Sequence, residues 1–181
     1  MKLLVLVHNR FNDVELTGVV ACLERTKKLD DIVYYNPKYT KAIGQFSIIK
    51  LNMVNKVDFN EFDILFVPGG PGAQELRKDK ESLKIIEKFI QNKKYVISIC
   101  DAPNVIYENH IIDDSIPYSS YPIPNMVASN LRNDNMVTNH KGKFLSGKCA
   151  GAAVDLGIEA VKEIFGKEMG SQAKIWMYAK K

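Results

Sequence analysis

Short, continuous apolar runs alternate with segments of helical periodicity along most of this chain. The apolar runs cover residues 3–7, 32–35, 64–67 and 95–99, and the helical patterns cover 13–28, 81–91 and 150–165. Runs without polar alternation are typical of strands buried on both faces, and strands that alternate with helices form parallel sheets. The sequence therefore predicts an α/β protein in which helices cover both faces of a mostly parallel sheet.

The stretch from residue 118 to 145 is less regular. Two short apolar segments, 136–138 and 143–145, flank the polar residues 139–142, a pattern that predicts a small added hairpin. Because the 181 residues contain no internal repeat and no linker, we expect one domain over 1–181.

Composition excludes several classes of protein. Hydrophobic residues make up 46% and charged residues 25%, and the net charge of +4 comes from scattered lysines without a nucleic-acid-binding signature. The apolar run at 3–7 is too short for a signal peptide or a membrane span. Three dispersed cysteines do not form a disulfide framework or a zinc site. We expect a cytoplasmic protein with reduced thiols and no nucleic-acid or membrane partner.

Parallel sheets place their sites at the carboxyl ends of the strands. Three loops meet this condition: residues 8–12, residues 68–73 and the corner at Cys100. We expect them to form the walls of one cleft.

Cys100 lies where the apolar run 95–99 ends and a helix is expected to begin. A thiol near the positive end of a helix is favoured as thiolate, the reactive form. The alternative is a small hydrophobic residue that covers the end of a core strand, because free cysteine is often buried. This segment supports both interpretations equally.

Glu15 falls in the first turn of the helix that follows the first strand, at the same sheet edge as Cys100. If buried, its carboxyl would have a raised pKa and could donate a hydrogen bond to a thiolate. The alternative is an exposed acid that complements the helix dipole.

The glycine-rich segment 68–72 lacks the Lys-Ser/Thr of a phosphate loop and the spacing of a dinucleotide fingerprint. Its backbone N–H groups could hold an oxyanion opposite the thiol, or the segment could simply be a tight turn.

A thiol nucleophile in a hydrolase normally needs a histidine base. His140 falls in the predicted hairpin turn, His110 precedes an acidic loop, and His8 lies at the right sheet edge but reads better as a loop histidine with its own partners. The sequence therefore offers no clear Cys-His pair.

Taken together, these segments resemble the ThiJ/PfpI superfamily, specifically its DJ-one-like branch, over nearly the whole chain. The motifs that carry the resemblance are Asp13-Val14-Glu15-Leu16, the glycine loop 66–73, the nucleophile turn 97–103 and the closing segment 146–154. The resemblance implies a flavodoxin-like (class I glutamine amidotransferase-like) three-layer α/β/α sandwich.

The same resemblance implies roles for individual residues. Cys100 and Glu15 would be the catalytic pair, and the backbone N–H groups of Gly69, Gly70 and Asp101 would hold an oxyanion. Arg25 matches an arginine of the family's dimer interface, so a homodimer is expected.

Three positions depart from the family pattern. Tyr121 stands where some members carry a histidine, and tyrosine is a weak base at neutral pH. Asp101 replaces a small apolar residue; we expect its side chain to point away from the thiol or to cap the next helix. Cys149 stands where glycine is common; it could resolve an oxidised Cys100 as a disulfide, or be a small buried turn residue.

The resemblance implies action on small reactive aldehydes, glyoxalase- or deglycase-like, in stress protection and without cofactor or metal. The main alternative is a non-enzymatic sensor or chaperone in which an oxidant converts Cys100 to sulfinate. A cysteine hydrolase or protease, and a thiamine-pathway protein, carry less weight.

Overall fold

The computed structural model describes residues 1–179 and is built on a six-stranded sheet with the order β2-β1-β5-β6-β10-β9. The strands are β1 (Lys2–Leu6), β2 (Asp31–Tyr35), β5 (Ile64–Val67), β6 (Tyr95–Ile99), β9 (Val137–His140) and β10 (Phe144–Gly147). All neighbours pair in parallel except β9 and β10, which are antiparallel at one edge. The predicted mostly parallel sheet is confirmed.

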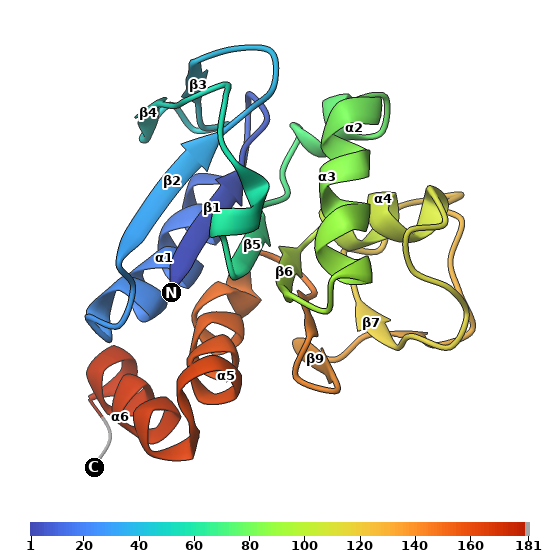
Figure 1. The fold of residues 1–181 in the computed structure, drawn as a ribbon. Coiled ribbons are helices and arrows are strands. Elements are labelled where there is room, and N and C mark those ends of the chain that lie inside the picture. Colours follow the sequence, from blue (N-terminus) through green and yellow to red (C-terminus); the bar gives the residue numbers. More distant parts are fainter. Residues whose placement is uncertain (180–181) are drawn as a thin grey trace.

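Helices cover both faces of this sheet (Figure 1). One layer holds α1 (Asp13–Arg25), α5 (Ala153–Phe165) and α6 (Lys167–Tyr178); the other holds α2 (Ala73–Leu76), α3 (Lys80–Gln91) and α4 (Ala102–Glu108). Side chains of β1 alternate between the layers, because Leu3 and Val5 pack in the core beside α1 while Leu4 and Leu6 pack beside α3. This is the flavodoxin-like three-layer arrangement.

The predicted hairpin is β9 and β10, and it belongs to the main sheet. Phe144 and Gly147 of β10 pair in parallel with Val96 and Ile99 of β6, so the hairpin extends the sheet rather than standing beside it. The sequence pattern missed this because Ser146 and Gly147 interrupt the apolar run of β10 and because most residues of β9 are polar.

Several smaller elements were not predicted from the sequence. These are the hairpin β3 (Lys41–Ile43) and β4 (Lys50–Asn52), the pair β7 (Tyr118–Ser119) and β8 (Arg132–Asn133), the 3-10 turns η1 (Phe59–Glu61) and η2 (Ala150–Ala152), and α6. The helix expected over 13–28 ends at Arg25, because Lys27 adopts a positive φ of 54°. The helix expected from residue 150 begins as η2.

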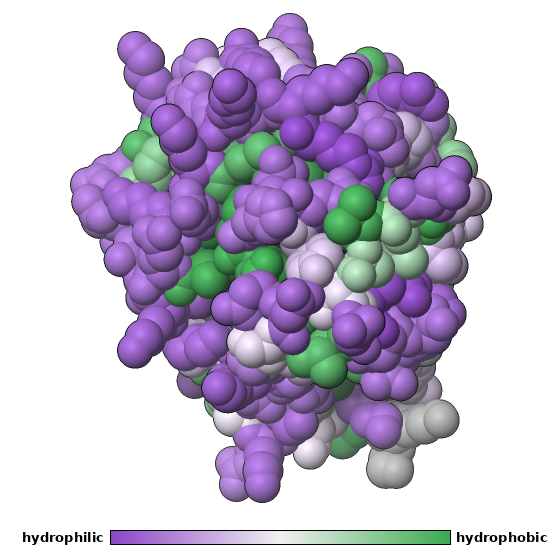
Figure 2. All heavy atoms as spheres, turned by 90° about the vertical axis from the view of Figure 1, so that its right-hand side faces the viewer, coloured by the Kyte–Doolittle hydropathy of each residue, from purple (hydrophilic) through white to green (hydrophobic). Residues whose placement is uncertain are grey.

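Within residues 1–179, no helix is long and apolar enough to cross a membrane. The face on the α4 side is mainly hydrophilic, with apolar patches between the polar side chains (Figure 2).

Candidate functional site

Cys100 occupies a strained corner between β6 and α4. Its φ of 64° lies in the left-handed region, which a non-glycine residue adopts at an energetic cost. Its N–H donates to the Gly147 carbonyl at 2.9 Å, and its own carbonyl accepts from the Tyr121 N–H at 2.8 Å. The sheet and the 118–121 segment thus hold the corner from both sides, with the thiol half-buried.

Glu15 reaches the same corner from α1. Asn12 caps this helix, its side chain accepting the N–H groups of Val14 and Glu15 at 3.0 and 3.2 Å. The Glu15 side chain is fully buried, so the exposed-acid alternative is excluded. Its Oε2 accepts the Gly69 N–H at 2.9 Å, whereas Oε1 has no hydrogen-bond partner among the described residues.

The glycine loop fits between the side chains of Cys100 and Glu15 because Gly69 has no side chain. A Cβ atom there would lie 2.7 Å from Cys100 Cβ and 2.9 Å from Glu15 Oε2. The Gly69 carbonyl also accepts the Asn12 N–H at 3.1 Å, and Gly72 N–H donates to the Arg10 carbonyl at 3.2 Å. The three loops at the sheet edge therefore meet, as the sequence predicted.

The protonation states of Glu15 and Cys100 are coupled. Burial raises the pKa of Glu15 to about 7, against the effect of hydrogen bonds from Cys100 and Gly69. Burial, and next the charge on Glu15, raise the pKa of the Cys100 thiol. The helix position alone therefore does not make Cys100 a thiolate. The thiolate is least costly when the neighbouring carboxyl keeps its proton.

Two backbone N–H groups favour negative charge at the sulfur. The amides of Gly70 and Asp101 hydrogen-bond the Cys100 side chain and oppose the rise of its pKa. The Gly69 amide, in contrast, is directed at Glu15. Of the three amides that the resemblance suggested for an oxyanion, two face the sulfur and the third positions the acid.

The Asp101 side chain points away from the thiol and does not cap α4. Its carboxylate forms a bidentate ion pair with Arg77, at 2.6 and 2.7 Å. Arg77 directly follows α2, and its Nε donates to Glu108 at 2.8 Å. Sequence analysis did not identify Arg77, because only the fold brings residue 77 next to residue 101.

Three further residues considered in the sequence analysis, Tyr121, Cys149 and Arg25, lie at different places. Tyr121 contacts the corner through its backbone N–H, which donates to the Cys100 carbonyl, and Tyr121 itself is 46% exposed. Cys149 is half-buried at the start of η2, two residues after the Gly147 that holds Cys100. Arg25 lies at the end of α1 with its guanidinium 5.6 Å from the ring centre of Trp176 in α6.

His8 is part of a separate buried cluster. Its Nε2 lies 3.2 Å from Asp79 Oδ2 and 3.3 Å from Ser82 Oγ, and Lys38 reaches the other Asp79 oxygen at 3.2 Å. In the described part of the chain, no histidine is hydrogen-bonded to Cys100.

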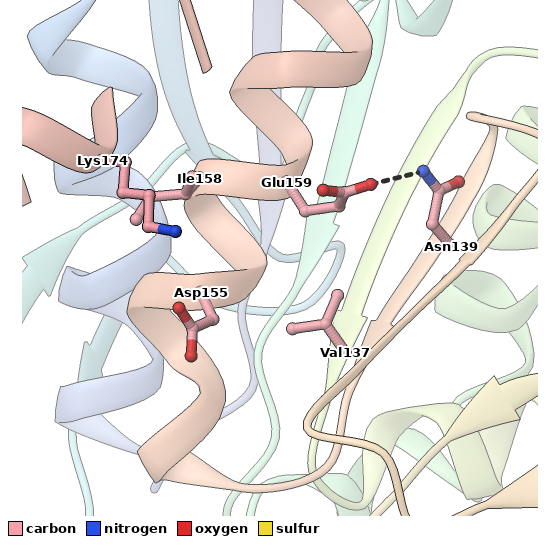
Figure 3. A pocket seen from close by; sticks show the side chains of 6 residues that line it. All are labelled: Val137, Asn139, Asp155, Ile158, Glu159 and Lys174. Atoms are coloured by element: carbon pink, nitrogen blue, oxygen red, sulfur yellow. Dashed lines mark hydrogen bonds between the residues drawn. The ribbon is translucent and has the colours of Figure 1, made fainter. Parts of the chain in front are cut away.

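A cavity of about 400 Å³ lies beside α5 and includes none of these residues (Figure 3). Two of its lining residues are hydrogen-bonded, the Asn139 side chain donating to Glu159 at 2.9 Å. The other lining residues are Val137, Asp155, Ile158 and Lys174. Over residues 1–179, no group of three or more His, Cys, Asp or Glu side chains is arranged to hold a metal ion.

Comparisons with known proteins agree with this architecture. The model of the DJ-1/PfpI family matches residues 1–163. The uncharacterized protein MG029 of Mycoplasma genitalium is 36% identical over 156 residues, which cover 85% of this chain and 83% of that protein. The structure of oxidized Toxoplasma gondii DJ-1 superimposes with a TM-score of 0.83 at 18% identity, covering 97% of each chain.

A more distant relative carries an activity in its name. Deglycase PH1704 of Pyrococcus horikoshii is 32% identical over 109 residues, which cover 59% of this chain and 64% of that protein. The extent of the family match and the identity to the Mycoplasma protein establish the relationship: this chain belongs to the DJ-1/PfpI family.

Proposed function

We propose that the protein acts on small reactive aldehydes through the Cys100 thiol, with Glu15 as its proton carrier. The observation that carries the proposal is a fully buried carboxyl with a pKa near 7, placed against a cysteine in a strained corner. A carboxyl with this pKa is populated in both protonation states at neutral pH, as a general acid and base must be.

Methylglyoxal is the substrate that best suits this pair. The Cys100 thiolate adds to the aldehyde carbon to give a hemithioacetal, whose oxyanion the Gly70 and Asp101 amides would stabilise. Glu15, having given its own proton to that oxyanion, then removes the hydrogen of the same carbon as a proton and returns it to the adjacent ketone carbon, while the hydroxyl proton passes to the ketone oxygen. The first carbon is oxidised and the second reduced, giving a lactoyl thioester. Water hydrolyses the thioester, so methylglyoxal and water become lactate.

Relatives named as deglycases support this reaction class, since glycated amines are formed from the same aldehydes. That support extends to about three fifths of the chain, because the match to PH1704 covers 59% of it.

Oxidation of Cys100 is the second candidate function. The unpartnered, buried Glu15 Oε1 favours it, because a protonated carboxyl could donate a hydrogen bond to an oxygen of a cysteine sulfinate. Two equivalents of hydrogen peroxide would supply the two oxygen atoms. In this alternative the protein senses oxidants and does not turn over an aldehyde.

We also propose that the protein forms a homodimer through the surface formed by α1 and the 43–51 hairpin. The Asp13 carboxylate accepts the N–H groups of Phe46, Ile48 and Ile49, which folds this hairpin onto the first turn of α1. Phe46 is 57% and Ile48 72% exposed, beside the exposed Val14. A second copy would cover this apolar surface, as the family resemblance suggests.

The experiment incubates wild type, Cys100→Ser and Cys22→Ala with methylglyoxal and follows lactate by proton NMR. The proposal expects steady production by wild type and Cys22→Ala and none by Cys100→Ser. Absence of lactate with wild type, together with a mass gain of two oxygen atoms on the Cys100 peptide after peroxide treatment, would favour the sensor instead.

A further inference from the structure

The ion pair between Arg77 and Asp101 connects the two loops that shape the thiol site. Arg77 follows the glycine loop and α2, and Asp101 follows Cys100 directly. The two terminal NH2 groups of Arg77 each donate to one carboxylate oxygen of Asp101, at 2.6 and 2.7 Å, in the planar bidentate geometry that arginine favours. α2 and α4 are themselves in contact.

This pair is largely removed from solvent. The side chains of Arg77 and Asp101 are 18% and 9% exposed. Asn104 also donates to Asp101 at 3.0 Å, and with the same amide group to the Tyr121 carbonyl at 2.9 Å. Asp101 is thus connected through Arg77 to the helix that follows the glycine loop, and through Asn104 to the 118–121 segment that bonds the Cys100 carbonyl. A surface ion pair contributes little, whereas removing one partner of a buried pair leaves an uncompensated charge away from water.

The charges around the thiol differ in sign and come from several elements. Glu15 approaches from α1, Asp101 lies at the start of α4, Arg77 follows α2, and Glu108 at the end of α4 shares Arg77 with Asp101. The charge of Asp101 raises the pKa of Glu15 even with Arg77 in place. Without Arg77, a buried negative charge would lie uncompensated one residue from Cys100.

We propose that Arg77 and Asp101 are positioning residues that set the charge balance of the Cys100–Glu15 pair. Arg77 neutralises the negative charge of Asp101, so that a thiolate can form at the neighbouring Cys100. Arg77 also holds the glycine loop against the nucleophile turn. This inference deepens the proposed function, since it concerns the same thiol, but it makes no use of a substrate.

The proposal predicts opposite changes in the stability of the Cys100 thiolate when Arg77 or Asp101 is removed. A purely structural ion pair would not produce opposite changes. Loss of Arg77 leaves the negative Asp101 and makes the thiolate less favourable. Loss of Asp101 leaves the positive Arg77 and makes the thiolate more favourable. Loss of both removes both charges, and the two effects cancel.

The test measures the rate of Cys100 alkylation by iodoacetamide across neutral and alkaline pH, read by mass spectrometry of the Cys100 peptide. Arg77→Gln should shift the profile up by about 1 pH unit and Asp101→Ala down by a similar amount, with the double variant near wild type. Arg77→Lys, which keeps the charge, should stay near wild type. Lys162→Gln, which breaks the ion pair with Glu159 on α5, is the matched control.

Thermal unfolding accompanies each profile, so that loss of fold is recognised. If Arg77→Gln does not fold, Asp101→Ala still tests the sign of the effect, and Arg77→Lys tests whether a positive charge at residue 77 is sufficient. Shifts in the same direction for Arg77→Gln and Asp101→Ala, or rates equal to those of wild type in both variants at every pH, would overturn the proposal. Because alkylation needs no aldehyde, the result does not depend on whether methylglyoxal is turned over.

Discussion

The backbone N–H of Gly69 donates a 2.9 Å hydrogen bond to Oε2 of Glu15, and so joins the glycine loop to the acid of α1. This bond fixes the carboxyl at the place where Gly69 also touches Cys100, because a Cβ at residue 69 would lie 2.7 Å from Cys100 Cβ. One glycine thus sets the spacing of the acid and the thiol.

Glu15 should make stability depend on pH. Its folded pKa of about 7 lies above the value of about 4.3 in an unfolded chain. Between these two pKa values the folded state binds a proton at Glu15 that the unfolded state does not. The stabilisation that this proton gives the fold is complete below the unfolded pKa and is lost as pH rises through 7. The loss is at most about 4 kcal/mol.

Glu15→Gln keeps the acceptor for Gly69 but cannot ionise. Denaturant unfolding of both proteins over acidic to alkaline pH should show the variant gaining stability relative to wild type as pH rises from about 4 to about 7, with no further gain above that range. A constant difference between the two proteins at all pH values would contradict the raised pKa.

Gly69→Ala should displace the site. Its new methyl group would lie 2.6 Å from the Ile99 carbonyl as well as against Cys100, so backbone must move. We expect a loss of about 1–3 kcal/mol of stability, measured by denaturant unfolding, and slower alkylation of Cys100. Gly151→Ala is the control, because its Cβ would meet only ordinary contacts at 3.7 and 3.8 Å. Equal behaviour of the two variants would show that Gly69 is not tightly packed.

His8 should matter for stability and not for the thiol. It is only 4% exposed and contacts Asp79 and Ser82. Burial raises the pKa of Asp79, but the hydrogen bonds from His8, Ser82 and Lys38 outweigh it and lower the pKa below its usual value. His8→Gln should cost about 1–3 kcal/mol in denaturant unfolding, since it disturbs a buried polar cluster.

In the same His8→Gln protein, the Cys100 alkylation rate should stay within about twofold of wild type, a difference of under 1 kcal/mol. A much larger fall in that rate, without a fall in stability, would instead make His8 the base that the sequence failed to provide.

The dimer proposal predicts that Ile48→Glu is monomeric in sedimentation velocity while wild type is dimeric. A charge at this largely exposed position would be buried without a partner at the interface. Val127→Glu changes another exposed apolar residue, 64% exposed and outside the α1 surface, and should remain dimeric. A monomeric wild type at micromolar concentration would refute the proposal.

Four strands of the sheet, β1, β2, β5 and β6, could be predicted from the sequence because they are largely continuous apolar runs. Residues 64–67 and 95–99 match β5 and β6 at both ends, since a charged residue precedes each run and Pro68 or the corner at Cys100 ends it. β3, β4, β7 and β8 could not be predicted, because two- and three-residue strands have no periodicity of their own.

The site could be predicted in outline because it lies at strand ends. The meeting of Glu15, Gly69 and Cys100 follows from the sheet order and from short loops. The partner of Asp101 could not be predicted, because Arg77 is 24 residues away and nothing in the pattern orients α2 against α4. The raised pKa of the thiol also depends on burial, which the helix position alone does not reveal.

The account depends most directly on Glu15 as the proton carrier for chemistry at Cys100. Lactate production from methylglyoxal by Glu15→Gln tests this, with wild type and Cys100→Ser measured alongside. We expect turnover to fall at least about a hundredfold, near the range by which general acid–base catalysis contributes, while peroxide still oxidises Cys100. Turnover by Glu15→Gln equal to that of wild type would contradict the account.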